Sequence, residues 1–519
     1  MKKKIQEIFI NDNTKFWRHS KEPDSKKLLL VETSSHPVIN HANAVVGKMI
    51  AQAKNLRIAW IKHPRIPEEI MRSYSQNSIF LDFPPLDLLT RFCILLLSTF
   101  YYFFYVLVKN NPLSFKFQKI PYGDFVYDGY LSKYSMATLH RPDSRIIIIF
   151  YRLLLNHQKA RLILNKNPIK AILVSHYVGL SSGPLSRVAM QMNIPVYWKG
   201  RGHATICLAV FNKLGQIYNF PRKPTKKIID LLIKKHKKSV EADFKEFIKR
   251  VNSSSYYGAF SVAYNNVIFS EVTRESFLKR MNLSDKPIVF IMLHAFNDKP
   301  HSHFKEMLFN DYYDWFLKTF HFAKKDKSKN WIIKEHPVNR FYKTKDLNLK
   351  KMMEKLPRHI RFVSQDSNIK ASTVLNVADV IITCIGTAGV EMPALRGIPS
   401  IIAGNTFFDG LGFTVEPKSK KEYFEILKNL SLKPLSPKQQ LKAKSCYLYL
   451  NKYSVMPFAA GPAITFKEST KPHDLESTYP IRILRAYKKD KRLITAQFNR
   501  YLTEIRKKNF QYLSKWPRQ

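Results

Sequence analysis

The sequence predicts an α/β protein made of two successive domains, each built on a parallel sheet. Two observations support this prediction. The chain has 519 residues, which is more than a single compact core usually holds. Short apolar strands alternate with helical segments, and this rhythm stops and then starts again part-way along the chain.

The first run of alternating segments fills the N-terminal half of the chain. Its predicted strands are 27–32, 56–61, 170–175 and 194–198. Helical patterns follow several of them, and a long basic helix is predicted over 224–251. A strand followed by a crossover helix is typical of a parallel sheet, so we expect a Rossmann-like domain over 1–283.

An uncharged apolar segment, "FCILLLSTFYYFFYVLV" from Phe92 to Val108, interrupts this first run. It is close to the shortest helix that spans a bilayer, which needs about 20 residues. A spanning helix, a buried helix and a helix docked on a membrane are all compatible with it. We favour docking of residues 89–108, because Arg91 and Lys109 flank the segment and cations suit an anionic lipid surface.

The second run of strands and helices begins near residue 287. Its predicted strands are 287–293, 331–335, 359–364, 379–384 and 399–404. We therefore expect a second Rossmann-like domain over 284–478 and a basic helical tail over 479–519. Two Rossmann-like domains that face a cleft form the architecture called GT-B, and that is the predicted fold class.

The net charge narrows the possible partners. The chain carries 86 Lys and Arg against 39 Asp and Glu, a formal charge of +47, which favours nucleic acid, anionic lipid or phosphorylated metabolites as partners. The basic residues are dispersed, and the sequence has no zinc finger, RNP motif or basic zipper, so nucleic acid is not expected as the main partner.

Several other classes are disfavoured by missing motifs. The four cysteines form no C-x-x-C pair, which argues against a zinc site or a disulfide framework and suits a reducing cytoplasm. The N-terminal "MKKKIQEIFINDN" is too polar for a signal peptide. Neither G-x-G-x-x-G nor a P-loop occurs, so a conventional NAD enzyme and a P-loop NTPase are not expected.

The stretch "CIGTAGVEMPALRG" predicts a binding site for a nucleotide donor. A strand ends at Cys384, and small residues lead into a helix, which lets a phosphate approach the backbone and the positive helix N-terminus. The predicted donor-binding residues of this stretch are Gly386, Thr387, Gly389 and Glu391. The alternative is an ordinary strand-to-helix turn with a glutamate in its first turn.

The stretch "WIIKEHPVNR" places a histidine where a buried strand stops. Pro337 cannot continue a central strand, so His336 is expected at the strand's carboxyl end, where open α/β sheets bind ligands. Lys334 and His336 alternate to the same side, and a cation beside an imidazole suits a phosphate leaving group. The alternative is a surface histidine beside a turn.

The loop "MLHAFNDKPHSHF" supplies candidates for a general base. Asp298 or His294 could take a proton from an acceptor hydroxyl. The loop lacks regular metal-ligand spacing, so no metal is expected. The alternative is a capped turn, because Asn297 and Asp298 before Pro300 are good turn residues.

Three residues of the first domain are candidates for holding the acceptor: Asp128 in "YGDFVYDGYL", His176 in "VSHYVGLSSGP" and Arg201 in "WKGRGH". The alternative for each of the three is a structural role without contact to an acceptor.

These motifs together resemble a known family. "KEHP" followed by "GTAGVEMPALRGIP" resembles the bacterial capsule polysaccharide biosynthesis family, which includes retaining β-Kdo transferases. The His-Pro pair is also similar to that of bacterial sialyltransferases and of teichoic-acid glycerophosphotransferases. "YDGYL", "GPLSRVAMQMNIPVY" and "HAFNDKPHS" resemble surface-carbohydrate biosynthesis proteins, and the resemblance covers most of 28–404.

The resemblance implies a GT-B glycosyltransferase that often uses a CMP-activated sugar acid and needs neither a metal nor a cofactor. It implies that His336 contacts the nucleotide phosphate, and that Thr387, Gly389 and Glu391 hold phosphate and ribose. The family's acceptor-side acid or base has no clear counterpart here. Asp298 in that role is inferred from the residues, with Asp128 as a rival.

The sequence therefore predicts a cytoplasmic glycosyltransferase of bacterial surface polysaccharide synthesis, peripheral on the inner face of the inner membrane. Its expected partners are a nucleotide-sugar, a glycan or lipid-linked glycan acceptor, and the anionic membrane surface. The sugar, the acceptor and the stereochemical outcome stay open. Two alternatives remain: a CDP-glycerol-type glycerophosphotransferase, and a non-enzymatic protein that binds polyanions or nucleic acid.

Overall fold

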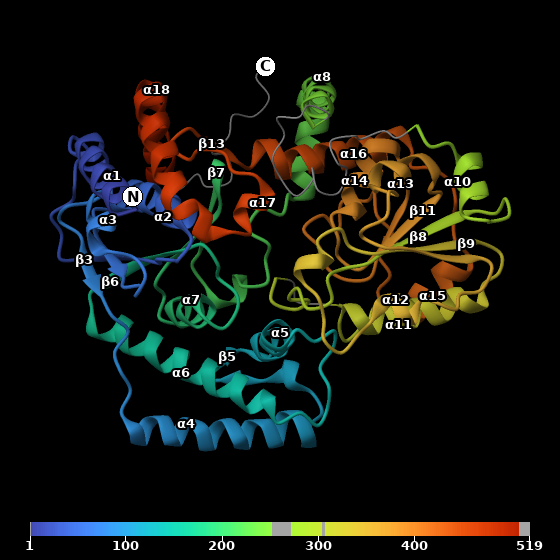
Figure 1. The fold of residues 1–519 in the computed structure, drawn as a ribbon, viewed down its shortest axis with the longest axis horizontal. Coiled ribbons are helices and arrows are strands. Elements are labelled where there is room, and N and C mark those ends of the chain that lie inside the picture. Colours follow the sequence, from blue (N-terminus) through green and yellow to red (C-terminus); the bar gives the residue numbers. More distant parts are fainter. Residues whose placement is uncertain (1, 252–270, 304–306, 508–519) are drawn as a thin grey trace. The chain divides into compact units, whose positions relative to one another are not determined.

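The structure is a computed structural model, and it describes residues 2–251, 271–303 and 307–507. The chain divides into two compact units (Figure 1). Among the described residues, unit 1 contains the chain up to Val126, then Pro142–Ile217, then 452–507. Unit 2 contains Tyr127–Arg141 and Tyr218–Asn451.

Unit 1 is built on a six-stranded sheet with the order β13-β7-β6-β1-β2-β3. Its strands are β1 (Leu28–Val31), β2 (Arg57–Ile61), β3 (Ile79–Leu81), β6 (Ile169–Val174), β7 (Val196–Phe211) and β13 (Met456–Phe458). Every pair is parallel except β13 with β7. The first five strands in chain order lie as 3-2-1-4-5, which is a Rossmann-like arrangement.

Both faces of the unit 1 sheet are covered. In β1, Leu29 and Val31 join the core cluster that contains α2 (Pro37–Lys54), whereas Leu28 and Leu30 are also buried but lie outside this cluster. Successive side chains of a strand point to opposite faces, so both faces of β1 are packed. This burial explains why the strand reads as a continuous apolar run.

The remaining elements of unit 1 complete its layers. They are α1 (Lys2–Trp17), α3 (Glu68–Arg72), α4 (Leu88–Tyr101) with its continuation η1 (Tyr102–Val108), η2 (Pro112–Ser114), β4 (Lys116–Phe117), β5 (Ile120–Pro121), α6 (Arg145–Lys166), α7 (Ser182–Gln191), η3 (Leu214–Gln216), α17 (Phe466–Ser469) and α18 (Pro472–Arg506). The first boundary between unit 1 and unit 2 falls within the helix α5 (Gly123–Tyr134), between Val126 and Tyr127.

The helix α18 contains most of the basic helical tail predicted over 479–519. It packs along α2 and against α1, as Figure 1 shows. Its Tyr479, Ile483, Tyr487 and Phe498 are buried in the unit 1 core. These residues follow a helical spacing that buries one face, while the basic residues lie between them. The helix is therefore a layer of unit 1, and residues 508–519 of the predicted tail lie outside the described residues.

Unit 2 is built on a five-stranded, fully parallel sheet with the order β10-β9-β8-β11-β12. Its strands are β8 (Ile288–Met292), β9 (Asn330–Lys334), β10 (Ile360–Val363), β11 (Val380–Thr383) and β12 (Ser400–Ile402). In chain order they again lie as 3-2-1-4-5. The prediction of two Rossmann-like domains is confirmed.

Helices also cover the unit 2 sheet. The helix α11 (Tyr312–Lys325) packs Trp315 and Phe316 into the cluster that holds Val289 and Ile291 of β8. The other helices of unit 2 are α8 (Lys226–Val251), α10 (Arg274–Arg280), η4 (Asn339–Phe341), α12 (Leu349–Met352), α13 (Ala371–Val377), α14 (Ala388–Arg396), α15 (Lys420–Lys428), α16 (Pro437–Leu448) and η5 (Tyr449–Tyr453).

The division between the units differs from the predicted boundary at residue 283. The helix α8 precedes that boundary, yet it packs against α16 and belongs to unit 2. Residues 127–141 also belong to unit 2, far from its other residues in the sequence. Both differences arise from contacts between segments that are far apart in the sequence. The alternation of strands and helices does not predict such contacts.

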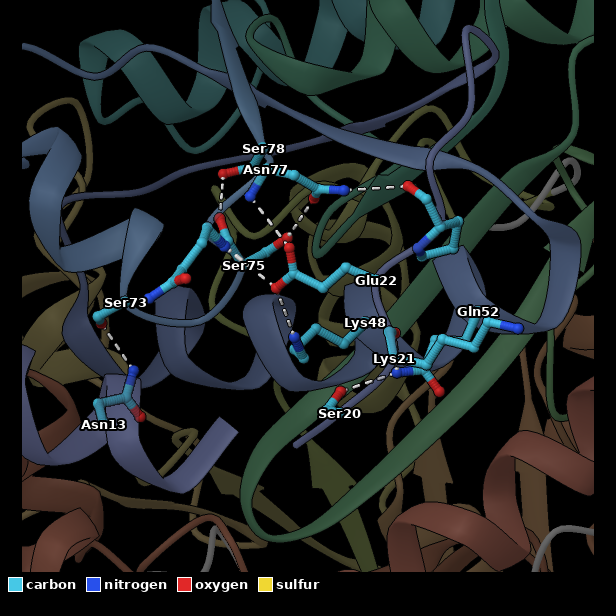
Figure 2. A network of polar contacts seen from close by, with 12 residues as sticks. Asn13, Ser20, Lys21, Glu22, Lys48, Gln52, Ser73, Ser75, Asn77 and Ser78 are labelled. Atoms are coloured by element: carbon cyan, nitrogen blue, oxygen red, sulfur yellow. Dashed lines mark hydrogen bonds and ion pairs between the residues drawn. The ribbon is translucent and has the colours of Figure 1, made fainter. Parts of the chain in front are cut away.

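A buried ion pair fixes the connection between α1 and β1 in unit 1. Lys48 of α2 is 2% exposed and its Nζ lies 3.1 Å from Glu22 Oε1. The same carboxylate accepts hydrogen bonds from the backbone N–H groups of Gln76 (3.1 Å) and Asn77 (3.0 Å). Figure 2 shows Glu22 at the centre of this network. One carboxylate therefore joins three segments of the chain.

Candidate active site

A pocket lies at the carboxyl edge of the unit 2 sheet, where the strand order reverses between β8 and β11. In open α/β sheets this is the position where ligands bind. The pocket is lined by residues 292–294, 334–337, 365, 370–371, 383, 386–388 and 391–392. Its volume of about 90 Å³ is less than the roughly 300 Å³ of a small-molecule site, so it fits a phosphate-sized part of a ligand.

The pocket brings together six residues that the sequence singled out: His294, Lys334, His336, Gly386, Thr387 and Glu391. They lie at the end of β9, in the loops after β9, β8 and β11, and in the first turn of α14. Parallel strands place their carboxyl ends at the same edge, which explains why residues far apart in the sequence meet here.

His336 is a neutral hydrogen-bond donor in this pocket. The backbone N–H of Val338 donates to its Nδ1 at 3.3 Å, which assigns the ring proton to Nε2. Burial, together with the nearby charge of Lys334, lowers the pKa of His336 to about 4. At neutral pH the ring is therefore uncharged and can offer its Nε2–H to an anion.

Lys334 and Lys370 supply positive charge to the same pocket. Lys334 is 6% exposed, and its Nζ donates to the backbone oxygen of Ile369 at 3.0 Å. Burial, aided by the charge of Lys370, lowers the pKa of Lys334 to about 8. Lys334 still carries most of its charge at pH 7.

The N-terminus of α14 faces the pocket through Gly386, Thr387 and Ala388. The backbone N–H groups of Gly389 and Val390 donate to the oxygens of Gly386 and Thr387 at 3.0 Å, so the backbone at Thr387 and Ala388, at the positive end of the helix dipole, is the part of this turn that suits an anion. Thr387 is the N-cap residue, and its exposed side chain makes no cap hydrogen bond. Glu391 lies in the first turn of the same helix and lines the pocket.

Gly386 allows the chain to pass very close to its neighbours. A Cβ at this position would lie 2.7 Å from Thr383 Oγ1 and 3.3 Å from His294 Cε1. The backbone N–H of Gly386 donates to Thr383 Oγ1 at 3.2 Å. A side chain would push this turn away from β11, so the small residue shapes the pocket.

His294 holds the pocket's wall in place, which argues against its predicted role as a general base. Its Nε2 accepts a hydrogen bond from the backbone N–H of Ile385 at 3.1 Å, and its ring stacks on Tyr312 with centroids 4.2 Å apart. Burial lowers the pKa of His294 to about 3. Its accepting nitrogen is occupied and weakly basic, so we assign it a positioning role.

Asp298, the other predicted base, lies elsewhere on the same loop. Its side chain is exposed and it is not among the residues that line the pocket. The turn that carries it is closed by a hydrogen bond from its backbone N–H to the oxygen of Ala295 at 3.0 Å. This exposed turn agrees with the turn chemistry of the sequence.

Gly389 does not line the pocket, in contrast to its predicted role in donor binding. A Cβ at this position would lie 2.8 Å from the ring of Phe408, and the Gly389 oxygen accepts from Ser400 Oγ at 2.9 Å. The small residue is needed for packing between α14 and its neighbours.

Asp128 anchors a loop of unit 2 instead of lying in unit 1 with the other acceptor-side residues. It is 2% exposed, and its carboxylate accepts from the backbone N–H groups of Ser302 (2.7 Å) and His301 (3.2 Å). The prediction placed it in the first domain because residues 127–141 precede the sequence boundary.

Glu335 is a residue whose importance the sequence did not reveal. It is buried, it accepts from Asn339 Nδ2 at 2.6 Å, and it accepts from the backbone N–H of Gln365 at 2.9 Å. It thereby ties the loop that carries His336 to the loop after β10. The available signal was its position inside "KEHP", at the end of a buried strand.

A second polar cluster lies at the carboxyl edge of the unit 1 sheet, and its Glu32 was not singled out from the sequence. Glu32, directly after β1, accepts from the backbone N–H of Ser175 at 2.7 Å, and burial raises its pKa. Burial lowers the pKa of Lys199 on β7 to about 8, against the charge of Glu32. The predicted acceptor-side residues His176 and Arg201 lie exposed in the same unit.

Comparisons with known proteins give weak likenesses. No family model and no curated protein matches the chain. Among solved structures, MurG from Acinetobacter baumannii is 12% identical over 82% of this chain and 95% of its own, with a TM-score of 0.25. The UDP-GlcNAc 2-epimerase from Neisseria meningitidis bound to UDP-GlcNAc is 12% identical over 82% and 98%, with a TM-score of 0.23.

The glycosyltransferase SnogD from Streptomyces nogalater is 11% identical over 90% of this chain and 99% of its own, with a TM-score of 0.21. TM-scores this far below 0.5 carry no argument about function. The two strand orders of the chain itself define its fold.

Proposed function

We propose that this chain is a glycosyltransferase that moves a sugar from a nucleotide-activated donor to a glycan or glycolipid acceptor. The observation that carries the proposal is the pocket of unit 2, which gathers Lys334, His336 and the N-terminus of α14 at the strand-order reversal. These groups are cations, a neutral N–H donor and backbone N–H groups. All of them recognise a phosphate.

In the proposed reaction the bond between the sugar and the donor's phosphate breaks, and its electron pair stays on the phosphate oxygen. The Nε2–H of His336, the charge of Lys334 and the α14 N-terminus stabilise that developing negative charge. Lys334 supplies a positive charge and His336 a neutral N–H donor, so the proposed step needs no metal. An acceptor hydroxyl forms the new bond at the sugar, and its proton passes to a base.

Asp298 stays the proposed base, since its exposed carboxylate is accessible to an acceptor whereas the accepting nitrogen of His294 is occupied. His176 and Arg201, exposed on unit 1, are proposed to hold the acceptor. Glu391, in the first turn of α14, is proposed to accept ribose hydroxyl groups of the donor.

We propose a CMP-linked sugar acid as the donor and a bacterial surface polysaccharide, capsular or of the lipopolysaccharide type, as the product. This rests on the resemblance carried by "KEHP" and "GTAGVEMPALRGIP". The proposed location is the inner face of the inner membrane, where lipid-linked acceptors lie, and the formal charge of +47 suits an anionic surface.

Thermal unfolding in the presence of CMP, CDP, UDP and GDP tests the proposal. A nucleotide at 100 times its Kd stabilises its binding state by about 2.7 kcal/mol, which is large enough to measure. We expect CMP to raise the unfolding temperature of the wild type and to have little effect on His336→Ala. His321→Ala, an exposed histidine of the same unit, is the matched control and should respond like the wild type.

The other outcomes separate the alternatives. Stabilisation by CDP, followed by transfer of glycerol phosphate from CDP-glycerol, would replace the proposed donor. No response to any nucleotide, together with tight and salt-sensitive binding to nucleic acid that His336→Ala leaves unchanged, would favour the polyanion-binding alternative.

A further inference from the structure

The helix formed by α4 and η1 presents a broad apolar face to solvent. Ten of the twenty exposed large apolar side chains in the described part of the chain belong to this single helix. They are Leu88, Leu89, Phe92, Leu95, Leu96, Leu97, Phe100, Phe103, Leu107 and Val108. Scattered exposed apolar residues are ordinary, whereas a concentration of this kind marks an interaction surface.

The opposite side of the same helix is fixed to the protein. Ile94, Ser98, Tyr102 and Val106 recur every four residues and are buried, with Ser98 at 0% and Val106 at 1% exposure. This stripe packs against α6, and Figure 1 shows α4 running alongside α6 at the margin of unit 1. One face of the helix is therefore buried against unit 1, and the other face is apolar and is not covered by unit 1.

By length and composition this helix could cross a bilayer. It is the one such helix in the described ranges, and it has 21 residues. At 1.5 Å per residue it measures roughly 30 Å, about the thickness of the hydrocarbon core.

The sheet of unit 1 excludes a crossing. The strands β1 and β2 precede the helix in the chain and β6 follows it, yet β1 pairs with both β2 and β6. A crossing would place β1 and β6 on opposite sides of the membrane. The partner helix α6 also carries Arg145, Arg152 and further cations that hydrocarbon does not accept.

Charges border the exposed apolar face. Arg91 lies in its first turn, and Lys109 follows its last residue with its Nζ 4.9 Å from the ring centre of Phe104. The helix α6, which packs against α4, exposes Ile148 and Arg152, whereas its exposed Arg145 is paired with Asp143. An apolar face bordered by cations is complementary to the acyl chains and anionic headgroups of a membrane surface.

We infer that α4 and η1 form an in-plane docking surface for an anionic phospholipid bilayer, with the exposed apolar face immersed below the headgroups. The inference deepens the membrane location in the proposed function and rests on that part of it. It specifies the contact residues and excludes a transmembrane anchor. It also places the membrane contact on unit 1, the unit that carries the proposed acceptor-side residues.

Vesicle flotation of the full-length protein tests the inference. We expect it to bind vesicles that contain phosphatidylglycerol more tightly than vesicles of phosphatidylcholine alone, and to lose part of this preference in high salt. The double variant Leu96→Asp with Phe103→Asp should lose at least about tenfold in vesicle affinity, because it places carboxylates in the immersed face.

Leu493→Asp is the matched control, because Leu493 on α18 is 50% exposed and Leu96 is 54% exposed. It should bind vesicles like the wild type. Far-UV circular dichroism and unfolding temperatures establish that the variants are folded. Equal loss in the control, or unchanged binding by the double variant, overturns the inference.

A different occupant of the surface would also be visible. One such outcome is a wild type that does not bind vesicles but forms a dimer, with a double variant that is monomeric. The surface would then bind a second copy of the chain, and the inference is overturned. Thermal stabilisation by nucleotides, measured without lipid, tests only the pocket of unit 2. Vesicle flotation tests only the docking surface, so failure of one proposal can be distinguished from failure of the other.

Discussion

Two histidines of unit 1, His157 and His41, are neutral, buried hydrogen-bonding groups. His157 in α6 is 0% exposed, accepts from the hydroxyl of Tyr122 at 2.9 Å and donates to Gln118 Oε1 at 3.1 Å. His41 in α2 lies between the hydroxyl of Tyr74 and the oxygen of Ala460. Burial lowers the pKa of both rings to about 4, as it does for His336 in the pocket.

Stability should therefore fall on mild acidification. The unfolded chain takes up protons on these histidines at about pH 6.5, whereas the folded chain does so only near pH 4. The stability is present above pH 6.5 and is lost as the pH falls toward 4, by on the order of 3 kcal/mol for each fully buried ring. The unfolding temperature measured at pH values between 7 and 4.5 should drop accordingly.

His157→Gln isolates one of these groups, because glutamine can still form hydrogen bonds but does not titrate in this range. The variant should lose less stability than the wild type between pH 6.5 and 4.5. An identical pH dependence in the two proteins would show that the His157 ring is not the group that is protonated.

Residue identity and strand ends were enough to predict which side chains meet in the pocket. Lys334 ends the strand β9 and His336 follows it, while Gly386 and Thr387 follow β11. The carboxyl ends of these parallel strands share one edge of the sheet, and strand ends can be recognised from the local sequence. Asp128 and Gly389 were misplaced because their surroundings are set by distant segments. The first binds the 301–302 loop and the second packs on Phe408.

Single polar groups connect helices and loops of this chain whose contacts the hydrophobic pattern does not predict. Glu22 has no repeating pattern around it, yet it joins the segment before β1 to α2 and to residues 76–77 (Figure 2). Lys48 is buried at its partner position, and burial lowers its pKa against the effect of Glu22.

Glu22→Ala should destabilise unit 1 by about 3–5 kcal/mol, because it leaves the Lys48 ammonium buried without its partner. Replacing both residues, as in Glu22→Gln with Lys48→Met, removes the buried charge and should restore much of the loss. Urea unfolding of the two variants and the wild type checks this. A single variant within 0.5 kcal/mol of the wild type, a value usual for surface substitutions, would contradict the account.

The strands were predictable because parallel strands buried on both faces read as continuous apolar runs, as in Leu28–Val31 and Ile288–Met292. The helix α18 was not recognised as part of the first domain. Its buried stripe contacts α2, which is more than 400 residues away in the sequence, and a basic composition obscured the stripe. Periodicity shows that a helix has an apolar face, but it does not show what covers that face.

At the scale of the whole molecule, the chain holds two Rossmann-like units with the same 3-2-1-4-5 strand order and with polar clusters at the carboxyl edges of both sheets. The two clusters have different chemistry. The pocket in unit 2 gathers groups that bind phosphate, whereas the edge of the unit 1 sheet carries the half-buried carboxylate of Glu32 and the buried Lys199. This division assigns the donor to unit 2 in the proposed function.

The central claim is that the pocket of unit 2 binds the phosphate of a nucleotide donor. The most direct measurement is a crystal structure of the full-length protein with the nucleotide that stabilises it most. We expect a phosphate oxygen within hydrogen-bonding distance of His336 Nε2 and of the backbone N–H groups at the start of α14. A nucleotide bound at any other place, with His336 and Thr387 not in contact with it, would contradict the account.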